Sequence, residues 1–327
     1  MDQKEVEFFQ NNGIVCQNLI AKGAYGTVYL VYSTQYGSNF ALKRIPEKLF
    51  SASEIDCLIA LDDQKIVSLY RYYKFDGYVY LLMEHCQNDL EKLLRFSKML
   101  SNKELQKYVY DVILCVKACH DRKIAHCDIK PSNFLIDKYG RIKITDFGLS
   151  KIYSENPTSL EFKGTKLFMA PEIFKKSAYN PMAADIWSLG VTLYYIATNT
   201  YPFFSNDHNK LIEKIESGEF PSEIIDNRYL RDLITKCITV DPNERPTVSQ
   251  LLELPYFNNL RNVGGEKLPL IRKDPIMKSN ELLLIKPNIE RKSNLVAPQS
   301  ALGYRRLSQP RIMPKYIPAR LNDMPKP

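Results

Sequence analysis

The chain has 327 residues, of which 45% are hydrophobic and 25% charged, so it is long enough for one large core or for two lobes around a cleft. No basic flank followed by an apolar run opens it, no apolar stretch reaches the roughly 18 residues of a membrane span, and the seven cysteines lack framework spacing. We therefore expect no secretory signal, no membrane span, reduced thiols and a cytoplasmic protein, with the nucleus as an alternative location.

The first part of the chain has the pattern of a sheet. Residues 1–18 are expected to be an N-terminal extension. From Leu19 to Glu84, short runs alternate between apolar and polar residues, with Tyr, Val, Phe and Leu prominent. This alternation predicts about five antiparallel strands, interrupted by one helix near 51–61.

A glycine-containing turn lies inside this strand-rich part. Gly23 and Gly26 lie in the segment 22–28 between two predicted strands, where glycines let backbone amides approach phosphate oxygens. A simple strand turn would have the same pattern. Lys43 follows on a later strand, and Glu54 near the start of the predicted helix could hold its ammonium toward a phosphate. The alternatives are a surface lysine and an exposed carboxylate in the first helical turn.

Helical periods replace the alternation after Leu90. Ser101 and Glu104 form a capping box ahead of an apolar stripe, and 183–197 is apolar on nearly every face, so this helix should be buried. The predicted fold is therefore α+β and bilobal, with a small five-stranded antiparallel β lobe that carries one helix and a larger α-helical lobe. A ligand cleft is expected between the lobes. The predicted boundaries are 19–84 for the small lobe, 84–89 for the hinge and 90–257 for the large lobe.

The segment from His126 to Asn133, followed thirteen residues later by Asp146-Phe147-Gly148, carries the strongest chemical signal. Phosphoryl transfer from ATP needs a carboxylate that orients the attacking hydroxyl and groups that hold Mg²⁺ on the phosphates. Asp128 suits the first task, and Asn133 and Asp146 suit the second. Lys130 could meet negative charge on the transferred group. The two motifs predict a phosphoryl transferase that uses ATP and Mg²⁺.

The C-terminal end differs in composition from the rest. Residues 258–327 contain 14 Lys or Arg against 5 Asp or Glu and nine of the nineteen prolines, whereas 1–257 contains 31 basic and 32 acidic residues. We expect a basic, mostly disordered tail. It could be merely solvated or could dock an acidic partner or a membrane surface. Within it, 271–290 is a candidate docking segment, and Arg305 to Ser308 resembles a phosphorylation site.

Further motifs complete a resemblance. From about Leu19 to Phe257 the chain resembles a eukaryotic serine/threonine protein kinase, most closely the calcium/calmodulin-dependent-kinase-like group. Besides the segments above, the resemblance rests on Ala41-Leu42-Lys43, the hinge 83–86, the segment 164–172 that ends in Ala-Pro-Glu, Asp185 to Gly190, and Asp241 to Thr247.

The resemblance implies a role for each matching residue. The phosphate loop would comprise Ala21, Lys22, Gly23, Ala24, Tyr25 and Gly26. The adenine site would comprise Val28, Ala41, Leu135, Met83 as gatekeeper, and the backbones of Glu84 and Cys86, with Asp89 near the ribose. Leu58, Leu69, His126 and Phe147 would stack into an apolar spine anchored by Asp185, and Glu172 would pair with Arg245. Lys130 and Thr165 favour Ser/Thr residues of protein substrates as acceptors.

Four departures from the family pattern raise questions. Ala21 replaces the first glycine of the phosphate loop, which predicts a weaker hold on the nucleotide at most. Cys127 stands where the family usually has an arginine that pairs with an activating phosphate, and Glu161 stands where many members carry a phosphorylated Thr. We therefore expect activity that does not depend on phosphorylation of 149–163. Glu54 lies only eleven positions after Lys43, which leaves their pairing open.

Two functions follow from these residues. The first is an active kinase that phosphorylates Ser/Thr residues of proteins, with a modest preference for an upstream Arg through Asp89. The second is a pseudokinase scaffold that binds nucleotide without catalysis, suggested by the departures. Pseudokinases commonly lose a metal ligand or the base, and this chain has lost neither. A nucleic-acid binder is not expected, because no recognised fold or aromatic interleaving accompanies the basic tail.

Overall fold

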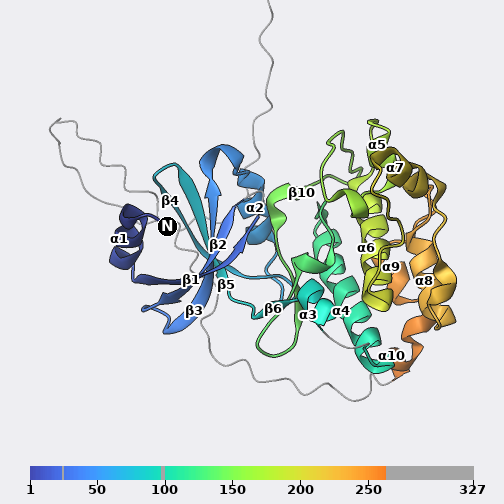
Figure 1. Ribbon diagram of the computed structural model, residues 1–327, viewed down its shortest axis with the longest axis horizontal. Helices are drawn as coiled ribbons and strands as arrows, with labels where there is room; N and C mark the ends of the chain where they lie inside the picture. The colour runs from blue at the N-terminus through green and yellow to red at the C-terminus, as the bar shows by residue number, and fades with distance from the viewer. Residues whose placement is uncertain (24–25, 97–99, 263–327) are drawn as a thin grey trace, which may run out of the picture. The chain divides into compact units, whose positions relative to one another are not determined.

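A five-stranded antiparallel sheet carries the first part of the chain in the computed structural model, which describes residues 1–23, 26–96 and 100–262 (Figure 1). The strands are β1 (Ile14–Lys22), β2 (Thr27–Ser33), β3 (Ser38–Pro46), β4 (Leu69–Phe75) and β5 (Tyr78–Glu84), in the spatial order β1-β2-β3-β5-β4. Helix α2 (Ala52–Ala60) follows β3 after a short 3-10 turn, η1 (Glu47–Leu49). The predicted five strands and the helix near 51–61 are confirmed.

The first eighteen residues contain more structure than the sequence indicates. Helix α1 (Gln3–Asn11) begins at a capping box in which Asp2 and Glu5 bond each other's backbone amides, and β1 starts at Ile14, ahead of Leu19, where we expected the strands to begin. Phe9 is fully buried and meets the rings of Tyr73 and Tyr80 edge to face. Because the helix has only a short apolar stripe, its periodicity alone did not reveal it.

Helices make up most of the second part. They are α3 (Leu90–Phe96), α4 (Asn102–His120), α5 (Pro171–Phe174), α6 (Pro181–Thr198), α7 (His208–Ser217), α8 (Arg228–Cys237), α9 (Val248–Leu252) and α10 (Asn258–Asn262). Ser101 and Glu104 form the predicted capping box at the start of α4. Helix α6 packs against α4 and α8, and its Trp187 is fully buried, as the apolar pattern of 183–197 predicts. The α+β fold is confirmed.

Short strands and turns carry the loops of the helical part. A three-stranded sheet comprises β6 (Asn88–Asp89), β8 (Phe134–Ile136) and β9 (Ile142–Ile144), and a two-stranded one comprises β7 (Ile124–Ala125) and β10 (Lys151–Ile152). The 3-10 turns are η2 (Pro131–Asn133), η3 (Phe147–Leu149), η4 (Lys166–Phe168), η5 (Ser222–Ile224) and η6 (Pro255–Phe257). Ile66, ahead of β4, bridges Ile144 of β9, which joins the sheet-bearing part to the strand that leads into Asp146.

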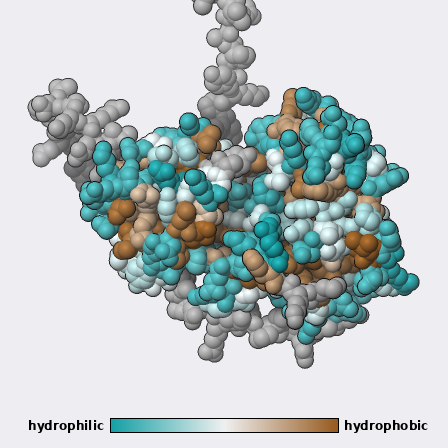
Figure 2. All heavy atoms as spheres, in the orientation of Figure 1, coloured by the Kyte–Doolittle hydropathy of each residue, from teal (hydrophilic) through white to brown (hydrophobic). Residues whose placement is uncertain are grey.

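The buried apolar residues form two clusters. The larger one runs from α2 and the inner face of the sheet through α4 and α6, and the smaller one lies between α1 and the other face of the sheet. On the face shown in Figure 2, hydrophobic residues occur in small groups among hydrophilic ones. Among the residues that the structure describes, no helix combines the length and the apolar character that crossing a membrane requires.

Candidate active site

A cavity of about 490 Å³ lies where the sheet, the hinge and the loops of the helical part meet. Its size is that of a small-molecule site. The residues predicted to contact ATP that line it are Ala21, Lys22, Gly23, Gly26, Val28, Ala41, Lys43, Met83, Glu84, Cys86, Asp89, Leu135 and Asp146, together with Lys130 and Asn133. Ala24 and Tyr25 lie outside the described residues.

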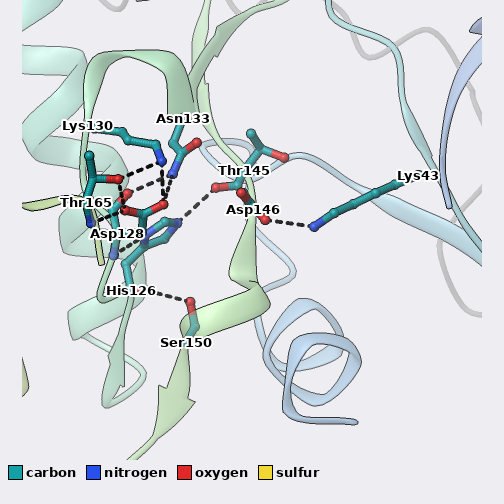
Figure 3. A network of polar contacts seen from close by, with 9 residues as sticks. All are labelled: Lys43, His126, Asp128, Lys130, Asn133, Thr145, Asp146, Ser150 and Thr165. Atoms are coloured by element: carbon teal, nitrogen blue, oxygen red, sulfur yellow. Dashed lines mark hydrogen bonds and ion pairs between the residues drawn. The ribbon is translucent and has the colours of Figure 1, made fainter. Parts of the chain in front are cut away.

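Lys43 is the centre of an ion-pair network at this cavity. Its ammonium lies 2.6 Å from the Glu54 carboxylate on α2. It also lies 2.7 Å from the Asp146 carboxylate, a contact drawn in Figure 3. Burial opposes the charge of the lysine, but Asp146 and Glu54 outweigh it and raise the pKa of Lys43 above its ordinary value. Lys43 is therefore protonated and directed into the cavity, and α2 lies close enough to β3 for the pairing that the sequence left open.

The side chains around Asp128 form a second cluster (Figure 3). One carboxylate oxygen accepts hydrogen bonds from the hydroxyl and the amide of Thr165, at 2.8 and 3.1 Å. The other accepts from Lys130 at 2.7 Å, and Lys130 also donates to the Thr165 hydroxyl at 2.9 Å. This geometry brings a carboxylate and an ammonium close together. Phosphoryl transfer to a hydroxyl group uses both, the carboxylate to orient the hydroxyl and the ammonium to stabilise negative charge.

Buried contacts with α6 and with Phe147 hold the loop that carries Asp128 in place. Asp185 of α6 accepts from the backbone amides of His126 and Cys127 at 2.7 and 2.9 Å, which orients the loop that leads to Asp128. The His126 ring meets Phe147 edge to face at 5.0 Å. Cys127 and Asp146 both adopt left-handed backbone conformations (φ 64° and 67°), which are unfavourable for non-glycine residues and concentrate at functional sites.

Asn133 and Asp146 carry the oxygen atoms that suit a divalent cation. The Asn133 amide nitrogen donates to the Asp128 carbonyl at 2.7 Å, and no hydrogen bond to its side-chain oxygen occurs among the described residues. One Asp146 carboxylate oxygen accepts a hydrogen bond from Lys43, and the other oxygen accepts no hydrogen bond from the residues that the structure describes. Burial favours the neutral form of Asp146, but Lys43 outweighs it and lowers the pKa below its usual value, so the carboxylate is ionised. These two oxygen ligands fit a hard cation that takes its other ligands from phosphate and water.

The hinge contains an ion pair that sequence reasoning missed. Glu84 at the end of β5 lies 2.8 Å from the buried ammonium of Lys143 on β9. This contact links the adenine side of the cavity to the strand that leads into Asp146. Burial, reinforced by Glu84, raises the pKa of the neighbouring Cys86 thiol to about 12. No sequence signal distinguishes Lys143 from a surface lysine.

Asp89 does not present a free carboxylate to a substrate. Its two oxygens receive the backbone amide and the ammonium of Lys92, at 2.8 and 3.0 Å. This local pairing weakens the expected attraction for an upstream Arg. The i, i+3 spacing of Asp89 and Lys92 was the sequence signal from which this pairing could have been predicted.

Other residues that line the cavity and were not predicted are Ile20, Val67, His85, Gln87, Asn88, Lys92, Ser132 and Thr145.

A buried ion pair supports the segment that follows Thr165. The guanidinium of Arg245 donates to both oxygens of the Glu172 carboxylate, at 2.6 and 2.8 Å, as the resemblance implied.

Cys115 and Cys119 are fully buried in the core face of α4. No group of three or more His, Cys, Asp or Glu that could hold a metal occurs in the part of the chain that the structure describes.

Comparison with known proteins places the chain in a family. Residues 15–257 match the model of the protein kinase domain, and the chain therefore belongs to the protein kinase family. It is 30% identical over 270 residues to mitogen-activated protein kinase kinase kinase YODA of Arabidopsis thaliana, covering 79% of this chain and 30% of that protein.

Two mouse proteins give similar values. Identity is 31% over 244 residues to sperm motility kinase 3A (72% of this chain, 48% of that protein) and 32% over 251 residues to serine/threonine-protein kinase Nek5 (74% and 40%). The chain thus spans less than half the length of these relatives. Their names belong to several kinds of kinase and do not confirm the calcium/calmodulin-dependent-kinase-like group.

Proposed function

We propose that this protein is an active serine/threonine protein kinase, which transfers the γ-phosphate of ATP to hydroxyl groups of protein substrates. The observation that carries the proposal is the Asp128 cluster, in which Lys130 and Thr165 contact the Asp128 carboxylate and Lys130 also lines the ATP-sized cavity. The protein kinase family uses ATP and a divalent metal ion. We propose Mg²⁺ as the metal, with Asn133 and Asp146 as its protein ligands.

Each group of the site has a task in this mechanism. Asp128 accepts a hydrogen bond from the acceptor hydroxyl and orients it for in-line attack, and Lys130 stabilises negative charge on the transferred group. Thr165, which bonds both, places the acceptor beside them. Lys43, held by Glu54, binds the phosphates. Bound Mg²⁺ supplies electrostatic stabilisation of the charge on the phosphate oxygens.

The remaining ATP-binding roles are proposed from position in the cavity. Val28, Ala41 and Leu135 would contact the two faces of the adenine, with Met83 behind it and the backbones of Glu84 and Cys86 at its edge. Ala21, Lys22, Gly23 and Gly26 would cover the phosphates, and Asp89 would lie near the ribose. Gly26 is required by space, because a Cβ there would lie 2.3 Å from the Arg44 carbonyl oxygen.

The direct experiment incubates the full chain with γ-labelled ATP, Mg²⁺ and a generic basic protein, and identifies the labelled amino acids. We expect label on serine and threonine that is lost when the metal is chelated. Absence of label, together with thermal stabilisation by Mg·ATP, would instead support the scaffold. That alternative is not favoured, because Lys43, Glu54, Asp128, Asn133 and Asp146 are all present and the ion pair of Lys43 is formed.

Several finer assignments stay proposals. Membership of the calcium/calmodulin-dependent-kinase-like group rests on the Ala-Pro-Glu segment and on Asp185 to Gly190. We propose a cytoplasmic or nuclear location, and a kinase domain followed by a basic tail from 258 that docks an acidic partner. The tail beyond Asn262, with its candidate segments 271–290 and 305–308, lies outside the described residues.

A further inference from the structure

The carboxylate of Glu161 is held by two lysines from different parts of the activation segment, 149–165. One oxygen pairs with Lys151 and the other with Lys163, whose ammonium is 2.7 Å away. Hydrogen bonds from Lys151 and Lys163 lower the pKa of Glu161 below its usual value, so its negative charge is permanent at neutral pH.

The two lysines connect Glu161 to both sides of the catalytic cluster. Lys163 also donates to the Leu149 carbonyl at 2.6 Å, just after Asp146-Phe147-Gly148. Lys151 belongs to β10, which pairs with β7 directly ahead of His126. Glu161 therefore joins the two ends of the activation segment to each other and, through β10, to the strand that precedes the Asp128 loop.

The backbone around Glu161 is anchored to the helical part. The Tyr179 hydroxyl donates to the Glu161 carbonyl at 2.7 Å, and Ser159 and Tyr179 exchange backbone hydrogen bonds at 2.9 and 3.0 Å. Four residues after Glu161, Thr165 contacts Asp128. Only three residues separate Glu161 from Thr165, and one of them, Gly164 (φ 111°), lies so close to Cys127 that a Cβ would be 2.9 Å from the Cys127 carbonyl oxygen. A displacement of Glu161 would therefore reach Thr165.

We propose that Glu161 is a positioning residue, which with Lys151 and Lys163 holds the activation segment in the conformation that accepts a substrate, without a phosphate group. This inference rests on the proposed kinase function and deepens it. Cys127 supplies no cation next to Asp128, and the two lysines provide the positive charge from the segment itself. A carboxylate carries one negative charge where a phosphate group carries about −1.5 to −2, and two ammonium groups are sufficient partners for it.

The magnitude of the effect follows from exposure. Glu161 and Lys151 are each partly exposed, with 43% and 44% of the side-chain surface accessible, so this pair alone contributes little. Lys163 is 12% exposed, so its pair with Glu161 is less screened by solvent. Losing both pairs at once should lower kcat/KM for the protein substrate by about tenfold. The KM for ATP should change by less than about twofold, because Glu161 and its two lysines do not line the nucleotide cavity.

The experiment compares Glu161→Gln with Glu155→Gln, a change to an exposed carboxylate on the same segment with no described ion pair. Activity is measured on the full chain before and after phosphatase treatment, and hydrogen exchange of 149–165 is measured on the same samples. We expect wild-type activity to survive the phosphatase. Glu161→Gln should lose about tenfold in kcat/KM and exchange faster across the segment. Glu161→Asp should recover part of both.

Two results would overturn the inference. One is equal exchange and equal kcat/KM in Glu161→Gln and Glu155→Gln. The other is a phosphatase-treated wild type that loses its activity together with a phosphate on 149–163. Should the wild type transfer no phosphate at all, the proposed function fails, and the exchange data still decide whether Glu161 orders the segment.

Discussion

The ammonium of Lys43 lies 2.6 Å from the carboxylate of Glu54, on a helix that begins only nine residues after the lysine. Burial of Glu54 and the second partner of Lys43, Asp146, fix the pair at the edge of the cavity. The short connection between β3 and α2 is thus compatible with a productive arrangement. A lysine held between two carboxylates is oriented to bind phosphate, as the proposed activity requires.

Removing the Glu54 charge tests this arrangement. Glu54→Gln should lower kcat by about tenfold to a hundredfold, because Lys43 then pairs with Asp146 alone and the phosphates are less well positioned. The matched control is Asp56→Asn, an exposed carboxylate on the same helix, which should leave kcat within about twofold. Steady-state kinetics with ATP measure both. Equal rates for the two variants would contradict a role for the pair.

The lowered pKa of Asp146 predicts a pH dependence of stability. A carboxylate whose pKa falls on folding stabilises the protein fully above its unfolded pKa of about 4, and this contribution disappears as the pH falls through the folded value. The difference in the free energy of unfolding between wild type and Asp146→Asn should therefore be constant from about pH 6 to about pH 8 and should shrink below about pH 4. Urea unfolding at a series of pH values measures it. A difference that grows on acidification would be inconsistent with the ion pair.

Helix α1 predicts a stability effect far from the site. Glu5 is fully buried, accepts from Arg44 at 2.7 Å and also bonds the Tyr80 hydroxyl. Glu5→Gln should lower the free energy of unfolding by about 2–3 kcal/mol, because Arg44 loses its partner in a mostly buried place. Glu7→Gln, at an exposed position of the same helix, should cost less than about 0.5 kcal/mol. Urea titrations decide it, and equal values for the two variants would argue against the buried pair.

The Cys86 thiol should react slowly although it lines the cavity. With a pKa of about 12, only ~1 in 10⁴ of these thiols is ionised at pH 8, and the thiolate is the reactive form. Alkylation followed by mass spectrometry should show a rate that rises about tenfold per pH unit from pH 7 to 9, without a plateau. A plateau near pH 8.5, as for a free thiol, would show that the thiol is not shielded by burial.

The sequence predicted those features that depend on local patterns. The capping box of Ser101 and Glu104 and the apolar faces of 183–197 involve neighbours within one helix, so spacing is sufficient to find them. Asp128, Lys130 and Asn133 also lie within one loop. Motif resemblance, rather than periodicity, related them to Lys43 and Asp146, which are separated by 103 residues and meet only in the fold.

Other features depend on contacts that no local pattern encodes. Glu84 and Lys143 lie 59 residues apart, and the burial that makes their pairing matter comes from both parts of the fold. From the sequence, Glu5 would be taken for a surface residue of a short helix, whereas in the structure it contacts Arg44 and Tyr80. Asp89 was expected to give at most a modest attraction for an upstream Arg, and its pairing with Lys92 shows how one neighbour changes the interactions that a residue can make.

Phosphate transfer by the wild type, compared with Asp128→Asn and Lys43→Met, decides whether Asp128 and Lys43 carry a kinase activity. The substrate is a generic basic protein, the donor is γ-labelled ATP, and circular dichroism confirms that each variant is folded. We expect label in the wild type and a loss of at least about a hundredfold in each variant. Undiminished transfer by folded Asp128→Asn would contradict this expectation.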